Sequence, residues 1–320
     1  RSQLLQSADL TAQVVFEQIA SATKDLLQAA ARFGISIVLM KGIWTATSVY
    51  PSRHHRTMSD IDVLTPNEQA PAFRRSLSES GYRNAASVPG SRIRKTHHHL
   101  PELRHPGTNI PIEIHTRLFS HPLVVNEPIF EMSAIWAHTE PGELDGIACR
   151  RFGAEFQLLY IVAHWAVDHK WSTNLISIND VVLVLREERE PIDWGLVDTM
   201  LLDNPRVADF LTVLLSFLDT AGLAAIPPEI ENRVKVSAQR IGKTNMRILH
   251  WLMLKFPFST REPASLIFGR PEAKALWVTL LEPRHKMLRP VIAVPRVIAR
   301  RLRSIVGSIG RKIGLLRSAE

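Results

Sequence analysis

The sequence has a single cysteine, few aromatic residues and no long apolar run. Cys149 is the one cysteine among 320 residues, which excludes an internal disulfide and a thiolate zinc site. The longest nearly uninterrupted apolar stretch, 210–218, is far shorter than the roughly 20 residues that span a membrane. The segment after Arg1 is polar and lacks the apolar core of a secretory signal. We therefore expect a cytoplasmic protein without a transmembrane helix.

Acidic residues are absent between residues 284 and 317, where positive charge is concentrated. The chain has a formal net charge of +8 at pH 7 and a pI near 9.9, which favours polyanionic partners. The basic residues of this segment are Arg284, Lys286, Arg289, Arg296, Arg300, Arg301, Arg303, Arg311, Lys312 and Arg317. Its apolar residues share one helical face, which is typical of a surface helix packed on the protein or of one that binds anionic lipid or nucleic acid. No aromatic residue follows Trp277, so peripheral contact with an anionic membrane or a protein is preferred to single-stranded nucleic acid.

The hydrophobic pattern changes near residue 150. Before it, short strand-like runs around 35–40, 60–64, 92–100 and 110–115 alternate with predicted helices over 8–33, 43–50 and 67–80. After it, helices are predicted over 153–169, 175–189, 192–202, 205–221 and 229–255. The sequence predicts an α+β fold. It has a mixed-sheet domain with an N-terminal helix over 1–150, an α-helical domain over 151–283 that closes the substrate cleft, and a basic amphipathic C-terminal segment over 284–320.

Two aspartates alternate with apolar residues in the run Asp60-Ile61-Asp62-Val63-Leu64. This alternation has the period of a β-strand, so both carboxylates are expected on one face. Carboxylate oxygens select magnesium or manganese over softer metals, and two such ions about 4 Å apart suit an in-line phosphoryl displacement. Two solvated acids on an exposed strand edge would give the same pattern, so this run alone leaves both interpretations open.

Lys41 and Gly42 interrupt the preceding apolar run, and Arg56 comes shortly before Asp60. A glycine after a strand lets backbone N–H groups approach phosphate oxygens at a helix N-terminus. The side chains of Lys41 and Arg56 would neutralise part of the charge of a triphosphate. These residues are therefore predicted to contact nucleotide phosphates.

Together these residues resemble a known family, the uncharacterised nucleotidyltransferase-like proteins of the DNA polymerase β-type nucleotidyltransferase superfamily. Its members carry Lys-Gly after a strand, then Tyr-Pro, then Arg-x-x-x-Asp-hydrophobic-Asp, which resemble Lys41-Gly42, Tyr50-Pro51 and 56–62 here. Its His-His-Leu-Pro and Glu-hydrophobic-His-x-x-Leu segments resemble 98–101 and 113–118. Landmarks of its helical half resemble His164-Trp165-Ala166, Asn179-Asp180 and Asp193-Trp194. The resemblance spans roughly residues 35 to 230.

The resemblance implies that 1–150 is a nucleotidyltransferase catalytic domain, which uses Mg²⁺ or Mn²⁺ to move a nucleoside monophosphate from ATP or another NTP to an acceptor. It implies Asp60, Asp62 and Glu113 as catalytic and metal-binding carboxylates. The residues expected near the nucleotide or acceptor are Lys41, Gly42, Arg56, Ser59, His99 and His115. Superfamily members usually have Gly-Ser or Gly-Gly at the position of Lys41-Gly42-Ile43, so Lys41 or Ser59 is expected to replace the missing serine hydroxyl.

Glu113 lies in the alternating run Ile112-Glu113-Ile114-His115. A strand here would bury both isoleucines and turn Glu113 and His115 to the opposite face. If it pairs beside the strand of Asp60 and Asp62, all three acids project into one cleft.

The acceptor is not encoded in any motif. Similar family members often lie beside genes for peptide natural products or polysaccharides, which implies a peptide, sugar or other small acceptor. Two alternatives stay open. A toxin-like transferase that modifies tRNA would suit the basic charge, and a non-catalytic nucleotide-binding scaffold protein would suit the missing serine.

Histidines are concentrated at His97-His98-His99. Strand alternation puts His97 and His99 on one face and His98 on the other, so at most two of them converge. The alternatives are a zinc site completed by His115, a histidine lining the nucleotide or acceptor pocket beside Glu113, and solvated histidines. The pocket role is preferred to zinc.

Three polar residues in the helical half are expected to be structural. His164 and Asp168 lie four apart on a predicted helix and would face each other, but a packed core with satisfied polar groups is the preferred interpretation. Asp193 precedes Trp194 and is predicted to cap the helix that begins there.

Overall fold

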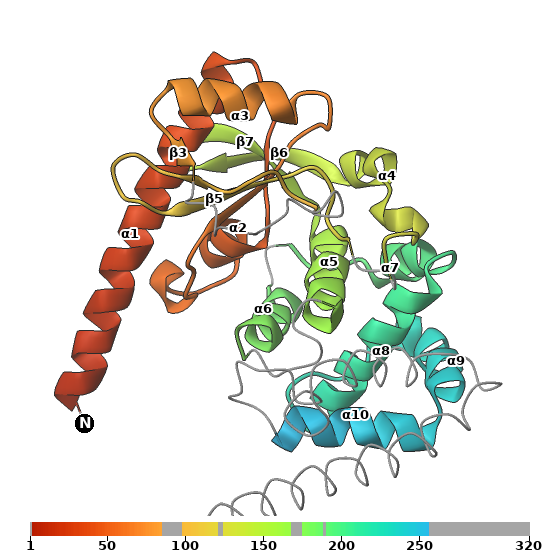
Figure 1. The fold of residues 1–320 in the computed structure, drawn as a ribbon. Helices are drawn as coiled ribbons and strands as arrows, with labels where there is room; N and C mark the ends of the chain where they lie inside the picture. Colours follow the sequence, from red (N-terminus) through yellow and green to blue (C-terminus); the bar gives the residue numbers. More distant parts are fainter. Residues whose placement is uncertain (1, 85–97, 121–123, 168–174, 188–189, 256–320) are drawn as a thin grey trace, which may run out of the picture.

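The structure is a computed structural model that describes residues 2–84, 98–120, 124–167, 175–187 and 190–255. It combines one mixed β-sheet with many helices, so the fold class is α+β as predicted (Figure 1). The strands are β1 (Val38–Leu39), β2 (Ile61–Leu64), β3 (Arg83–Asn84), β4 (Leu103–Arg104), β5 (Pro111–His115), β6 (Thr139–Leu144) and β7 (Ile147–Phe152). The helices of the first half are α1 (Ser2–Arg32), α2 (Lys41–Ser48), η1 (Arg53–His55), α3 (Ala70–Glu79), η2 (Pro128–Phe130) and α4 (Met132–Ala137). Those of the second half are α5 (Ala154–Val167), α6 (Leu175–Arg186), α7 (Trp194–Leu201), α8 (Pro205–Thr220), η3 (Pro228–Ile230), α9 (Glu231–Ile241) and α10 (Lys243–Lys255).

The sheet has the strand order β3-β4-β5-β2-β1-β7-β6. At its centre, β2 pairs in parallel with β5 and antiparallel with β1. On the other side of β1, β7 runs parallel to β1 and forms an antiparallel hairpin with β6. The strand of Asp62 therefore lies beside the strand of Glu113. The sequence analysis had stated this pairing only as a condition for the acids to share one cleft.

The two faces of the sheet have different coverings. Helices α1 and α3 cover one face, where they share a hydrophobic core with Ile61 and Val63 of β2 (Figure 1). Helices α5 and α8 belong to a second core, which includes Val38 and Met40. Since successive strand side chains point to opposite faces, Asp62 lies on the face that looks toward α5.

Helix α1 confirms and extends the predicted helix over 8–33. It ends before Gly34, whose φ of +65° is in the left-handed region that favours glycine. The first half of α1 projects away from the sheet (Figure 1), and Leu4, Leu5 and Leu10 are exposed along it.

Some elements differ from the sequence-based predictions. The single helix predicted over 229–255 is two helices, because Gly242 at φ +85° breaks the chain between α9 and α10. The β6–β7 hairpin was not predicted. Its turn places Asp145 at φ +49° and Gly146 at φ +83°, two left-handed residues in succession, as a tight hairpin turn requires.

Some predictions fall outside the described residues. The predicted strand over 92–100 does so for most of its length, as do His97, Asp168 and the whole segment 284–320. The domain limits at 150 and 283 stay predictions. Among the residues that the structure describes, no helix combines the length and apolar character needed to cross a bilayer.

Candidate active site

The centre of the candidate site is the pairing of Asp62 with Glu113. These residues lie directly opposite each other on the parallel strands β2 and β5, with Ile61 opposite Ile112 on one side of them. Because the isoleucines are buried toward α1 and α3, both carboxylates point to the other face of the sheet. Ligand atoms of Asp62, Glu113 and His115 all lie within 4.8 Å of one another.

Asp60 lies in the bend just before β2 rather than within the strand as the sequence predicted. Burial raises the pKa of Asp60 to about 6, and the negative charges of Asp62 and Glu113 act in the same direction. Asp60 therefore lies close enough to both acids to be repelled by them. Lys41 and Arg56 act in the opposite direction but do not offset burial and the two negative charges, so a bound cation would stabilise the ionised form of Asp60.

Among the three acids, Asp62 is the one whose negative charge is best compensated by neighbouring cationic groups. Its side chain is 9% exposed and lies 3.4 Å (Oδ2) from Lys41 Nζ and 3.1 Å (Oδ1) from His115 Nε2. Burial opposes its ionisation, but Lys41 and the hydrogen bond from His115 outweigh it and hold the pKa of Asp62 below its usual value. Asp62 is therefore ionised and paired with cationic groups.

His115 connects two of the acids. Its Nε2 lies 3.1 Å from Asp62 Oδ1 and 3.5 Å from Glu113 Oε2. Burial lowers the pKa of His115, but the hydrogen bonds to Asp62 and Glu113 dominate and raise it to about 9. The same contact with His115 lowers the pKa of Glu113. Its Nδ1 is buried and has no hydrogen-bond partner among the described residues.

Lys41 begins α2 at the edge of the site, and Gly42 follows it in the first turn. The backbone N–H groups of a first helical turn lack intrahelical partners and attract anions. The Nζ of Lys41 lies 2.6 Å from His164 Nε2 on α5. The sequence assigned His164 to the packed core; the structure instead places it at the site, across the sheet face from Asp62.

Arg56 belongs to a buried ion pair that the sequence did not predict. Its guanidinium donates to both carboxylate oxygens of Asp180 on α6, with Nε at 3.0 Å from Oδ1 and Nη2 at 2.8 Å from Oδ2. Tyr50 donates to the same carboxylate at 2.7 Å. Arg56 and Asp180 are 8% and 2% exposed. Nε and Nη2 of Arg56 are thus engaged in a buried ion pair, whereas Nη1 lies 3.7 Å from the place that a Cβ at Gly42 would occupy. The expected contact of Arg56 with a triphosphate stays a prediction.

We expect Arg56→Ala to lower the free energy of unfolding by about 3–5 kcal/mol, because it leaves the Asp180 carboxylate buried without its partner. Arg53→Ala is a matched control, since Arg53 is 49% exposed where it pairs with Asp145. The control should cost at most about 1 kcal/mol. Urea denaturation measures both variants, and equal losses would contradict the buried role of Arg56.

His99 lies beside Glu113 as expected, but His98 also lies against His115, whereas strand alternation had predicted it on the opposite face. The rings of His98 and His99 lie 5.0 and 5.5 Å from that of His115, and His99 Nε2 is 3.8 Å from Glu113 Oε2. Burial, together with His115 and His99, lowers the pKa of His98 to about 4. Within the described residues, the group at this place whose atoms could converge on one ion is Asp62, Glu113 and His115, without His98 or His99.

Ser59, Gly42 and Asp193 are the remaining residues with predicted roles. Ser59 is exposed next to Asp60. A side chain at Gly42 would contact the Met58 sulfur at 3.5 Å, so Gly42 lies against the segment that leads to Asp60. In the helical half, the predicted cap is confirmed, because Asp193 accepts a hydrogen bond from the Leu196 N–H at 3.0 Å.

The fold and the site together define an α+β protein of the nucleotidyltransferase type. The chain belongs to the family described as "Uncharacterised nucleotidyltransferase", whose sequence profile matches residues 2–218. The protein is thus a nucleotidyltransferase by family. The family assignment made from Lys41-Gly42, 56–62 and 113–118 is confirmed.

Two solved structures are similar to this chain. The antibiotic-resistance factor ANT(2'')-Ia has 12% identity over 57% of this chain and 88% of its own, with a TM-score of 0.38. An antigenic nucleotidyltransferase-like protein from Paracoccidioides brasiliensis has 14% identity over 68% of this chain and 93% of its own, with a TM-score of 0.43. At these TM-scores neither structure informs the site or the acceptor. Comparison with curated proteins gave no match.

Proposed function

We propose that the protein transfers a nucleoside monophosphate from an NTP to a hydroxyl group of a small acceptor such as a peptide or sugar, with release of pyrophosphate. The observation that supports this most is the placement of Asp62 opposite Glu113 on adjacent parallel strands, with Asp60 at the entry to the first. The N-terminus of α2 and the Lys41 side chain lie beside this group of acids.

The three carboxylates suit Mg²⁺ or Mn²⁺, because these ions prefer oxygen ligands. The raised pKa of Asp60 supports this fit, since burial and the charges of Asp62 and Glu113 outweigh the opposing charges of Lys41 and Arg56. Asp60, Asp62 and Glu113 are the residues that would hold the metal. A divalent ion bound there would neutralise charge on the phosphate oxygens and lower the pKa of the acceptor hydroxyl.

The chain's own groups have separate tasks in this proposal. Lys41 and the first turn of α2 bind and orient the negatively charged phosphates. Glu113 accepts the proton of the acceptor hydroxyl as the new oxygen–phosphorus bond forms and the bond to pyrophosphate breaks. His115 fixes the orientation of both Asp62 and Glu113. His99 borders Glu113 and lines the side from which the acceptor would enter.

Lys41→Ala should weaken binding of magnesium-NTP about 10- to 100-fold, because one charge-assisted contact to phosphate is worth about 1.5–3 kcal/mol. Calorimetric titration measures the affinity, and a thermal melt checks the fold. Lys24→Ala is the matched control, since Lys24 pairs with Asp145 at 3.0 Å and should leave the affinity unchanged. An unchanged affinity in Lys41→Ala would move the triphosphate site elsewhere.

The transfer itself is tested with full-length protein, magnesium, candidate acceptors and NTP labelled at either the α or the γ phosphate. We expect α label in a peptide, sugar or other small acceptor, γ label in pyrophosphate, and neither product when a chelator is present. Label in RNA would instead support the tRNA-modifying alternative. NTP binding without transfer to any acceptor would support a nucleotide-binding scaffold protein and contradict the proposed reaction.

A further inference from the structure

A second group of potential metal ligands lies away from the candidate active site, where α1 meets η1. Asp9 on α1 places its Oδ1 3.0 Å from His54 Nε2 and 3.5 Å from His55 Nε2. The ligand atoms of all three residues lie within 4.8 Å of one another. Two imidazole nitrogens thus converge on one carboxylate oxygen.

The distances match those between ligands of one metal ion. With bonds of about 2.0–2.1 Å, the atoms that ligate a tetrahedral ion lie about 3.3–3.4 Å apart. The two distances from Asp9 Oδ1, 3.0 and 3.5 Å, lie on either side of this value. His55 is 56% exposed, so its ring can adjust at the surface without disturbing packed neighbours.

The carboxylate is oriented by a further residue. Gln13, one turn later on α1, donates from Nε2 to the second oxygen of Asp9, Oδ2, at 2.8 Å. This bond leaves Oδ1 directed at the two histidines. Groups that orient a metal ligand in this way are typical of protein metal sites. The arrangement therefore has both ligands and a supporting residue.

We propose that Asp9, His54 and His55 bind a divalent transition-metal ion, with zinc the expected one, and that this ion joins α1 to η1. Two imidazole nitrogens and one carboxylate oxygen suit zinc, with a fourth position left for water, whereas magnesium prefers oxygen ligands throughout. The site is therefore chemically distinct from the group of carboxylates at Asp60, Asp62 and Glu113, and it does not depend on the proposed transfer reaction.

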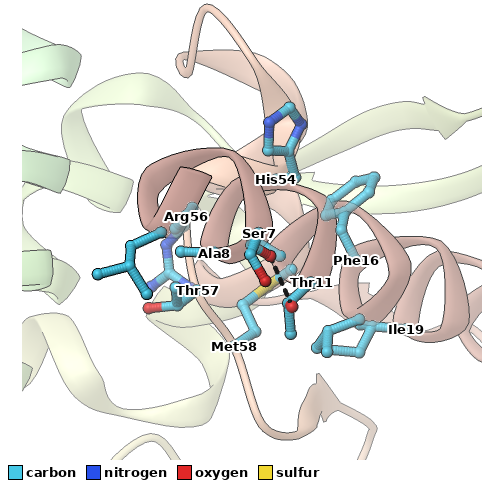
Figure 2. Close-up of a pocket in the computed structure, with 12 residues that line it drawn as sticks. Ser7, Ala8, Thr11, Phe16, Ile19, His54, Arg56, Thr57 and Met58 are labelled. Atoms are coloured by element: carbon cyan, nitrogen blue, oxygen red, sulfur yellow. Dashed lines mark hydrogen bonds between the residues drawn. The ribbon is translucent and has the colours of Figure 1, made fainter. Parts of the chain in front are cut away.

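The ion would secure one end of a cavity. A space of about 470 Å³ lies between α1 and the segment that follows η1, and His54 lines it together with Phe16 of α1 and Met58 (Figure 2). The wall formed by 56–58 continues directly into Asp60. A metal joining α1 to η1 therefore holds both walls of this cavity and the segment leading to the candidate active site.

Zinc titration of the full-length protein in excess magnesium tests the proposal, because magnesium occupies oxygen-rich sites and leaves nitrogen-rich ones. Wild type should bind one more equivalent of zinc than His55→Ala. The matched control is Asp25→Asn, because Asp25 on α1 also pairs with a histidine, His105, at 3.1 Å. The second ring nitrogen of that histidine is bonded to Thr108, so the control should bind zinc like wild type.

Hydrogen exchange along the first turns of α1 gives a second, independent result. Zinc at about ten times its Kd should slow exchange there about 10-fold in wild type and in Asp25→Asn, but not in His55→Ala. The same zinc stoichiometry in wild type and His55→Ala, including none in either, would overturn the proposal. A parallel loss of zinc in Asp25→Asn would also overturn it, because the loss would then follow the attachment of α1 rather than the ligands.

Discussion

Asp60→Asn is expected to lower nucleotidyl transfer about 10³-fold or more, yet to leave the ligand-free protein at least as stable as wild type. The loss follows because metal-assisted charge stabilisation is worth several kcal/mol, at about 1.4 kcal/mol for each factor of ten. The retained or increased stability follows from electrostatics. Burial and the charges of Asp62 and Glu113 raise the pKa of Asp60 to about 6, so its ionised form opposes folding.

The sign of this effect gives a pH window. The pKa of Asp60 is raised from 3.8 to about 6. The contribution of the Asp60 carboxyl to the stability of wild type therefore falls as pH rises from about 4 to about 6, and it stays at its lowest value at higher pH. The loss is at most about 3 kcal/mol, at 1.36 kcal/mol per pKa unit. With a chelator present, the free energy of unfolding of Asp60→Asn relative to wild type, measured in urea, should rise by up to this amount between pH 4 and pH 7.

Asp62→Asn is the matched control for this prediction. It should also abolish transfer, but it removes the carboxylate that pairs with Lys41 and His115, so it should destabilise the fold. The two substitutions therefore have opposite effects on stability although they remove the same chemical group. If Asp60→Asn proved less stable than wild type at pH 7 without metal, the proposed repulsion would be wrong.

Glu113→Gln is expected to reduce turnover about 10²- to 10⁴-fold, the usual worth of a positioned general base. The affinity for NTP should stay within a few-fold, because Asp60 and Asp62 remain on the side of the triphosphate. The glutamine keeps the size of the side chain and can still accept a hydrogen bond from His115. Steady-state rates and calorimetric titration separate the two effects.

Glu102→Gln is the control for Glu113→Gln. Glu102 lies next to β4 and pairs with Arg104 at 2.7 Å, so its substitution should change neither turnover nor affinity. A Glu113→Gln variant with wild-type turnover would remove Glu113 from the reaction. A joint loss of turnover and NTP affinity would instead assign Glu113 to the metal that binds the nucleotide.

The parts of the site that were predictable lie within short runs of sequence. The alternation in 60–64 and 112–115 correctly predicted the two strands that place Asp62 and Glu113 opposite the buried isoleucines, because strand periodicity is a local property. Asp60, which was also predicted within the first strand, lies in the bend before it. The helix over 8–33 and the cap at Asp193 were also local features. The β6–β7 hairpin had a local signal too, since Asp145-Gly146 is a strong turn dipeptide, and that signal was missed.

The contacts that could not be predicted join distant parts of the chain. Lys41 contacts His164 and Arg56 contacts Asp180 only because α5 and α6 pack beneath the sheet. No periodicity in either segment reports such a contact. The ion pair of Arg56 was missed for this reason: its place before Asp60 suggested a phosphate ligand, and its carboxylate partner lies in the helical half.

The parallel pairing of β2 with β5 has a consequence for how relatives of this chain can vary. The separation of Asp62 and Glu113 is set by backbone hydrogen bonds between neighbouring strands, about 4.8 Å apart. The residues between them form a crossover connection that passes through α3 and β4. Its length can change by insertion or deletion without moving one carboxylate relative to the other. In divergent sequences, the partner of the aspartate is therefore better located by strand register than by a fixed number of intervening residues.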